Sequence, residues 1–242
     1  MESDCSVLIV GAAILLVPDP ENLGDYDDVI NSVLFAQLVA NKQIERDSSV
    51  DWYDTYTQVL DNFWPRFLKT REDEYPRSDR EESVATLSVT AMANMEAGLG
   101  RLTAVAMSRL VNVPESSPAI NLLSRQMHKS GDSLAERPSG AGSDVHMLVI
   151  VAKTPDSLSS VYISFQHPPG LKPHPLAPFS RETDLPGVIT LRCAQAKLSE
   201  GLYRLAREGV AMKIKDRIAA NVIVVTEAVE AGIIDPSRET QP

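Results

Sequence analysis

The spacing of apolar residues changes at residues 129–143, a segment rich in Gly, Ser and charged side chains. Before this segment, apolar residues recur every three or four positions, which is typical of one face of a helix. After it they alternate in short runs, which is typical of strands. The pattern predicts a layered α+β fold in which helices pack on a mainly antiparallel sheet. Residues 1–128 are expected to be mainly helical, 129–143 a linker-like loop and 144–235 rich in strands, all within one domain of residues 1–242.

In the first part, two amphipathic helices are predicted at residues 25–42 and 51–68. The second contains six of the 13 aromatic residues, and Pro65 is expected to kink it. These aromatic side chains would either pack in the core or form the wall of a pocket for a lipid or another apolar ligand. Further elements are expected as follows: a solvated, densely charged loop at 70–82, two buried helices at 83–111 that meet near Gly98 and Gly100, and a short helix at 116–128.

In the second part, alternating apolar residues predict a hairpin of two strands at 145–152 and 161–165. The stretch 167–187 holds six of the 16 prolines, so it cannot be a central strand or a helix. Another strand is expected at 188–197, with Cys193 on its more apolar face. The remainder of the chain is expected to form a short helix followed by two more strands.

The formal charge of the chain is −10, from 33 acidic and 23 basic residues. Because sequence-independent binding to nucleic acid depends on phosphate neutralisation by Lys and Arg, this balance argues against a nucleic-acid partner. The apolar run 7–17 is shorter than the roughly 20 residues of a membrane-spanning helix, and the acidic residues before it argue against a secretory signal. A buried strand or short helix is expected there, with a surface position as the alternative. Cys5 and Cys193 are too few for a disulfide framework, so a reduced, cytoplasmic protein is the simpler interpretation.

Cys193 is the first candidate for covalent chemistry. A thiolate attacks acyl thioesters when a neighbouring base lowers the pKa of the thiol. His146 opens a strand expected in the same sheet, and Asp144 would share its strand face and orient the imidazole. The candidate catalytic residues are therefore Cys193, His146 and Asp144. The alternative is that Cys193 is a small core residue, because free cysteine is among the most buried residue types.

Other chemistry-bearing residues carry weaker signals. His167 and His174, with Asp184, have a spacing that matches no standard metal site, so no metal is expected. The acidic residues 25–28 are explained by the favourable interaction of acids with a helix N-terminus. The chain has no Gly-rich phosphate loop, G-x-S-x-G elbow or H-E-x-x-H motif, so no cofactor is expected from these patterns.

The chain resembles the Erwinia virulence factor family in the order of its elements and in three segments, NSVLFAQLVANK, WYDTYTQVLDNFWPRF and LRCAQAKLSEG. The resemblance implies an α/β fold with helices flanking an antiparallel sheet. It also implies a fatty acyl group that is joined as a thioester to a cysteine in the C-terminal part. In this chain only Cys193 matches that position, and Cys5 does not.

The leading hypothesis is a soluble fatty-acyl-binding protein that carries an acyl group on Cys193, or transfers it from an acyl thioester with His146 as the base. One acyl chain alone gives only marginal membrane binding, and the apolar run 7–17 would then provide a second, peripheral membrane contact. Two alternatives come from other classes. One is a non-enzymatic virulence or interaction protein whose cysteine is structural, and the other is a small biosynthetic enzyme that uses histidine.

Overall fold

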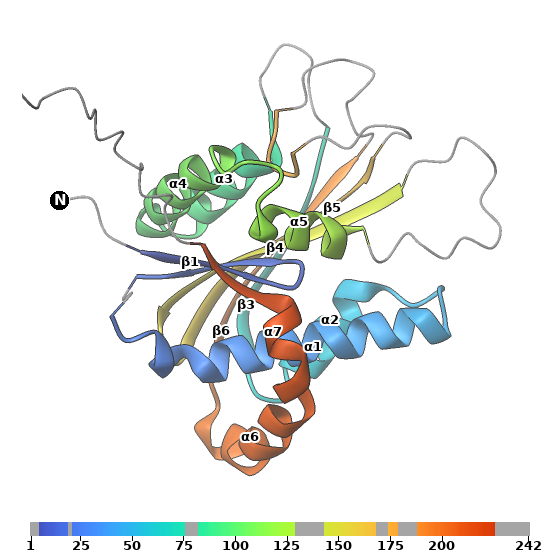
Figure 1. Ribbon diagram of the computed structural model, residues 1–242, viewed down its shortest axis with the longest axis vertical. Coiled ribbons are helices and arrows are strands. Elements are labelled where there is room, and N and C mark those ends of the chain that lie inside the picture. The colour runs from blue at the N-terminus through green and yellow to red at the C-terminus, as the bar shows by residue number, and fades with distance from the viewer. Residues whose placement is uncertain are drawn as a thin grey trace, which may run out of the picture.

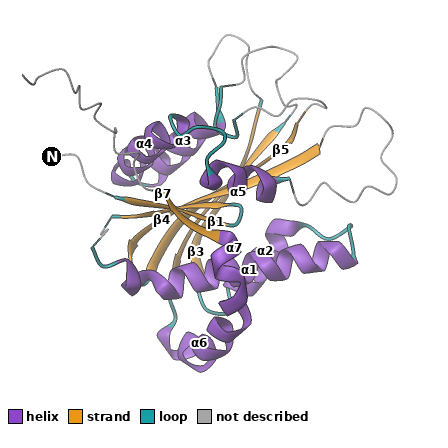
Figure 2. Cartoon of the chain, in the orientation of Figure 1, coloured by secondary structure: helices purple, strands orange, loops and turns teal. Residues whose placement is uncertain are grey.

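The computed structural model describes residues 5–18, 21–75, 82–128, 143–167, 174–178 and 188–225. Seven strands of these residues form one open sheet: β1 (Ser6–Val10), β2 (Ala13–Val17), β3 (Arg66–Glu74), β4 (Ser143–Thr154), β5 (Ser157–His167), β6 (Ile189–Lys197) and β7 (Val222–Val225). Their order across the sheet is β3-β6-β5-β4-β2-β1-β7. Figures 1 and 2 show the sheet between its flanking helices. Neighbouring strands are antiparallel except β2 and β4, which are parallel. The predicted class, helices on a mainly antiparallel sheet, is confirmed.

Helices cover both faces of this sheet (Figure 1). On one face lie α1 (Asp27–Arg46) and α2 (Trp52–Leu60), with α6 (Glu200–Ile214) packed against α1. On the other face lie α3 (Val84–Met95), α4 (Ala97–Val111) and α5 (Pro118–Met127), and the short α7 (Ile218–Asn221) leads into β7. The two faces are called below the α1–α2 face and the α3–α5 face. Each carries its own hydrophobic core.

Side chains of the central strands alternate between these two cores, because successive residues of a strand point to opposite faces of the sheet. In β4, Val145 and Met147 belong to the core under α3, α4 and α5, whereas Leu148 and Ile150 belong to the core under α1 and α2. In β6, Cys193 belongs to the α3–α5 core. Position along a strand therefore decides which core a residue can reach.

The structure differs from the prediction between residues 51 and 82. Helix α2 ends at Leu60, and β3 follows in place of the expected last helical turns and the start of the expected loop. Pro65 lacks the amide hydrogen that a continuing helix needs, so it separates α2 from the strand. β3 is an edge strand with mostly exposed side chains, which is why a densely charged sequence is compatible with a strand there.

The apolar run 7–17 forms two strands, β1 and β2, joined by a tight turn. Gly11 in this turn has φ +59°, in the left-handed region that favours glycine. The side-chain amide of Gln37 in α1 hydrogen-bonds the main chain on both sides of Gly11, at 2.8 Å each, and the Gly11 amide donates to the carbonyl of Asn221 at 2.8 Å. The run is buried, as expected, so it does not take the alternative surface position that a peripheral membrane contact would need.

Most other elements follow the predicted pattern. The segment 83–111 forms two helices, as expected, and Gly100 allows them to approach closely, because a Cβ there would lie 2.5 Å from the Cβ of Ala93. The segment 129–142 lies outside the described residues. After residue 199, the described part contains α6, α7 and the single strand β7, where one helix and two strands were expected. The spacing of Val210 and Ile214 on the buried side of α6 belongs to a helix, not to a strand.

Strands from both parts of the chain share the one sheet. β1, β2 and β3 come from the part that was expected to be mainly helical, and α6 comes from the part that was expected to be rich in strands. Within the described ranges, no helix combines the length and the apolar character that crossing a membrane requires.

Candidate functional site

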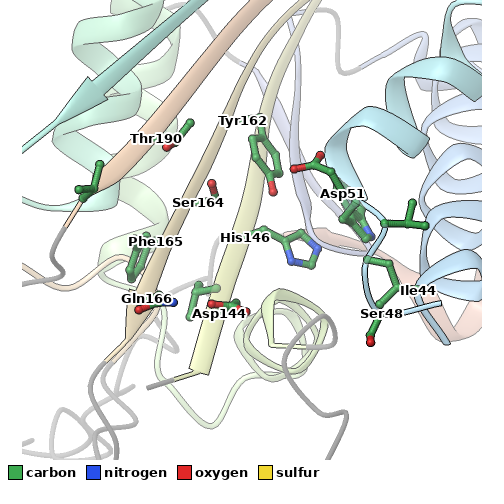
Figure 3. A pocket seen from close by; sticks show the side chains of 14 residues that line it. Ile44, Ser48, Asp51, Asp144, His146, Tyr162, Ser164, Phe165, Gln166 and Thr190 are labelled. Atoms are coloured by element: carbon green, nitrogen blue, oxygen red, sulfur yellow. The ribbon is translucent and has the colours of Figure 1, made fainter. Parts of the chain in front are cut away.

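A pocket of about 620 Å³ lies on the α1–α2 face, where the N-terminal ends of β4 and β6 and the C-terminal end of β5 meet the segment between α1 and α2 (Figure 3). In Figure 3 the imidazole of His146 points from β4 toward the side of the pocket where Ile44, Ser48 and Asp51 lie. The apolar residues that line the pocket are Ile44, Val50, Trp52, Val145, Phe165 and Val188. The polar residues that line the pocket are Ser48, Asp51, Asp144, His146, Tyr162, Ser164, Gln166 and Thr190.

Strand pairing brings three of these polar residues into one row. His146 in β4 is the direct cross-strand partner of Ser164 in β5, and Ser164 is the partner of Thr190 in β6. Directly opposite residues point to the same face, with Cβ atoms about 4.5–5.5 Å apart. The row continues into β3, where the Asp73 carboxylate accepts a hydrogen bond of 2.8 Å from the Thr190 hydroxyl. A line of hydrogen-bonding groups therefore crosses four strands, and its members on β4, β5 and β6 line the pocket.

His146 is held against aromatic side chains. Its ring centroid lies 4.2 Å from that of Trp52 and 6.3 Å from that of Tyr162, and the residue is only 3% exposed. The pKa of His146 is lowered to about 3, first by burial and then by nearby His128, and the negative charge of Asp144 offsets part of the change. The imidazole is therefore neutral at physiological pH and is a weak proton acceptor.

Tyr162 and Asp51 form the wall of the pocket beside His146. Burial raises the pKa of Tyr162, and the negative charge of Asp51 raises it further, so the phenol stays protonated and can donate a hydrogen bond. Asp51 caps α2, because its Oδ1 accepts from the amide of Asp54 at 2.8 Å. Its Oδ2 lies 3.4 Å from a guanidinium nitrogen of Arg192. These groups offer directed hydrogen bonds to a ligand more readily than proton transfer.

Cys193 lies on the other face of the sheet from His146. Its cross-strand partners are Val161 in β5 and Thr70 in β3, and its side chain belongs to the α3–α5 core, where it is 8% exposed. His146 lies between Val145 and Met147 of that core in sequence, so it points to the α1–α2 face. The structure therefore does not bring Cys193 and His146 together, and the prediction that His146 activates this thiol is wrong.

The surroundings of the thiol also disfavour its ionisation. Burial raises the pKa of Cys193, Glu72 raises it further, and an interaction with Thr70 offsets part of the change. A shallow depression of about 380 Å³ adjoins Cys193, and its lining includes the charged side chains of Arg66 and Lys69. An acyl chain needs a largely apolar surface, which this depression does not offer.

Asp144 and His146 share the α1–α2 face, as the sequence predicted, and both line the pocket. His174 is half-buried, burial lowers its pKa, and its Nδ1 accepts a hydrogen bond from the amide of Leu176 at 3.2 Å. The side chain of His167, and Asp184, lie outside the described residues. Among the residues that the structure does describe, no three His, Cys, Asp or Glu side chains gather closely enough to hold a metal ion.

Sequence reasoning missed the polar half of β5. Val161, Ile163 and Phe165 were recognised as its apolar face, and the same alternation places Tyr162, Ser164 and Gln166 on the opposite face. Those three side chains line the pocket. The aromatic residues of α2, in contrast, are mainly core: Trp52, Tyr53 and Tyr56 are at most 5% exposed, and of these only Trp52 lines this pocket.

Comparison with known proteins does not indicate a function for this chain. The resemblance to the Erwinia virulence factor family stays a prediction. A scan against models of protein families and a search of curated proteins each found no match to this chain.

Proposed function

We propose that this protein binds a small polar ligand, without covalent attachment, in the pocket beside His146. The observation that carries the proposal is the convergence of hydrogen-bonding side chains from three strands and from the start of α2 on one cavity of about 620 Å³. Pockets for small molecules have typical volumes of about 300–1,000 Å³ and contain a few polar groups that fix the orientation of the ligand.

The charges around the pocket favour a neutral or cationic ligand. Its described lining contains two carboxylates, those of Asp51 and Asp144, and no Lys or Arg. Arg192 lies beside Asp51 and balances part of its charge, and the described lining itself offers no Lys or Arg to an anionic ligand. A buried anion with no cationic partner is strongly disfavoured, so the free carboxylate of a fatty acid or a phosphate group fits this lining poorly.

The protonation states favour binding over acid–base catalysis. A general base works best when its pKa is near the working pH, and the pKa of His146, about 3, is far below it. The Tyr162 phenol stays protonated, so it serves as a donor. Ser164 adds a hydroxyl group that can donate and accept, and the Thr190 hydroxyl, which donates to Asp73, can still accept a hydrogen bond. The site is therefore suited to recognising hydroxyl, amide or amine groups.

Acyl carriage on Cys193 is the alternative that the sequence favoured. Without His146, the thiol would need another base, and its raised pKa keeps it protonated at neutral pH. A structural role for Cys193 agrees better with its place in the α3–α5 core. The two functions are separable, because ligand binding beside His146 does not involve the sulfur.

A fragment screen on two matched variants tests the proposal. Saturation-transfer NMR would compare neutral, cationic and anionic fragments on the wild type, on Ser164→Leu and on Ser160→Leu. Both serines lie on the α1–α2 face of β5, four residues apart, and only Ser164 lines the pocket. We expect neutral and cationic polar fragments to bind the wild type and Ser160→Leu, and to bind Ser164→Leu at least about tenfold more weakly, a loss of about 1.4 kcal/mol.

Two results would contradict the proposal. One is that neither substitution weakens the binding of the fragments, which would place binding elsewhere on the protein. The other is a preference for anionic fragments, which would overturn the charge argument. Thermal melts of both variants establish that each is folded, so that a loss of binding reports on the pocket.

A further inference from the structure

Helix α6 carries apolar side chains on two opposite faces. Tyr203 and Val210 are buried on the side that packs toward α1. Leu202, Leu205 and Met212 are 54%, 82% and 73% exposed on the other side. Leu205 and Met212 are seven residues apart, so they lie two turns from each other on one stripe, and Leu202 lies one turn before Leu205. Leu202, Leu205 and Met212 are called below the α6 outer face.

The position of α6 keeps this outer face in solvent. Arg207 forms hydrogen bonds of 2.8 Å to the carboxylates of both Asp28 in α1 and Glu200, and its guanidinium lies over the Tyr203 ring. These contacts fix which side of the helix faces the body of the protein. Figure 1 shows α6 at the lower edge of the molecule, outside the layers that enclose the sheet. Single exposed apolar residues are ordinary, but three in one helical stripe indicate an interaction surface.

The charge of this segment is opposite to that of the whole chain. Residues 200–221 contain five basic and three acidic residues, a net charge of +2 in a chain of −10. Four of the basic residues are exposed, namely Arg204, Lys213, Lys215 and Arg217. An exposed apolar stripe with flanking cations is the pattern of a helix that lies in a membrane interface.

We propose that the α6 outer face docks on a lipid surface that carries anionic headgroups. The three apolar side chains enter the headgroup region, and the flanking Lys and Arg side chains meet lipid phosphates at the surface. A symmetric contact between two copies of this face would bring two positively charged segments together, so charge favours lipid over a second copy. This contact is independent of the pocket, and it involves a different segment from the buried run 7–17.

Vesicle co-sedimentation tests the proposal on the full chain. The probes are vesicles of phosphatidylcholine alone and of phosphatidylcholine mixed with phosphatidylglycerol, at low and high salt. We expect the wild type to sediment with the mixed vesicles at low salt, and the double variant Leu205→Gln/Met212→Gln to lose at least about tenfold in partitioning. Phe67→Gln is the matched control, because Phe67 is 71% exposed on β3 and lies outside the α6 outer face. It should bind as the wild type does.

Four outcomes would overturn the proposal: no sedimentation of the wild type with mixed vesicles, equal binding to both vesicle types, no change in the double variant, or a loss in Phe67→Gln as large as in the double variant. A wild type that is dimeric by light scattering, and that the double substitution makes monomeric, would assign the face to a second copy instead. Circular dichroism establishes that the variants are folded. Should the double variant not fold, the charge reversal Lys215→Glu/Arg217→Glu makes the same test, because both side chains are exposed, the apolar side chains stay unchanged, and binding to the mixed vesicles should be abolished.

Discussion

Between pH 7 and pH 5, the free energy of unfolding should fall by about 2 kcal/mol because of His146 alone. In the folded protein the pKa of His146 is about 3, and in the unfolded chain it returns to its ordinary value of 6.5. Between these two values the unfolded chain binds a proton that the folded protein does not. Stability therefore rises with pH in this window and falls as the solution is acidified, by about 1.4 kcal/mol per pH unit well below pH 6.5.

The magnitude depends on how completely the imidazole is kept from water. His146 is 3% exposed and packs on Trp52, so protonation must either place a charge in the core or open the contact between α2 and β4. A single group of this kind contributes little at pH 7, because the unfolded chain is then mostly deprotonated as well. At pH 5 nearly all of the unfolded chain carries the proton, and about 2 kcal/mol is a substantial part of the 5–15 kcal/mol that typically stabilises a domain.

Urea denaturation followed by circular dichroism at pH 7, 6 and 5 measures this effect. The variant His146→Phe keeps an aromatic ring and cannot be protonated, so its stability should fall less between pH 7 and pH 5 than that of the wild type, by about 2 kcal/mol. Tyr162→Phe is the control, because it changes a neighbouring ring and keeps the imidazole, and it should show the dependence of the wild type. An identical pH dependence in the wild type and His146→Phe would refute the burial of a neutral imidazole at this position.

Gly11→Ala should lower the free energy of unfolding by about 1–3 kcal/mol, because φ is positive there and the new Cβ would lie 2.5 Å from the Gln37 side chain. Gly100→Ala should lower the free energy of unfolding by about 1–3 kcal/mol, because the new Cβ forces α3 and α4 apart. At Gly201 a new Cβ would meet no atom within 4 Å, so Gly201→Ala should be neutral or stabilising by up to about 1 kcal/mol. Urea denaturation measures the stability of all three variants. Cys193→Ser should destabilise by about 1–3 kcal/mol through a buried hydroxyl, and the intact mass of the wild type should show no adduct that hydroxylamine removes.

A specific result would contradict each of these predictions. An unchanged stability in Gly11→Ala would mean that the turn relaxes without losing the hydrogen bonds of Gln37. Equal effects of Ala at Gly100 and Gly201 would contradict close contact between α3 and α4. A labile adduct on the wild type that is absent from Cys193→Ser would restore acyl carriage as the function.

Periodicity predicted the helices and the β4–β5 hairpin because their apolar residues repeat within one element. It missed β3, whose sequence RFLKTREDE carries the charges of a solvated loop. An edge strand is held largely by main-chain hydrogen bonds to its neighbour, so side-chain pattern carries little information about it. Periodicity also predicted one element where the structure has β1 and β2. Both strands are buried on both faces, and only Gly11 marks the turn between them.

For the candidate site, the sequence could predict that Asp144 and His146 share a face, because residues two positions apart on one strand point to the same side of the sheet. The relation of Cys193 to His146 was not. Whether residues on different strands share a face depends on the strand order and on each register, and here Ser164, not Cys193, lies in the row of His146. Neither order nor register is encoded locally, since a shift of one residue moves every side chain of a strand to the other face.

The turn at Gly11 has a consequence for the timing of folding during synthesis. Its main-chain groups bond Gln37 in α1 and Asn221 in α7, and β1 lies between β2 and β7 in the sheet. At about 5–20 residues per second, the ribosome needs roughly 10–40 s to proceed from β1 to β7. During that interval one side of a very apolar strand has no native partner. The edge of β1 that pairs with β7 in the folded protein is therefore open to pairing with other strands until β7 emerges.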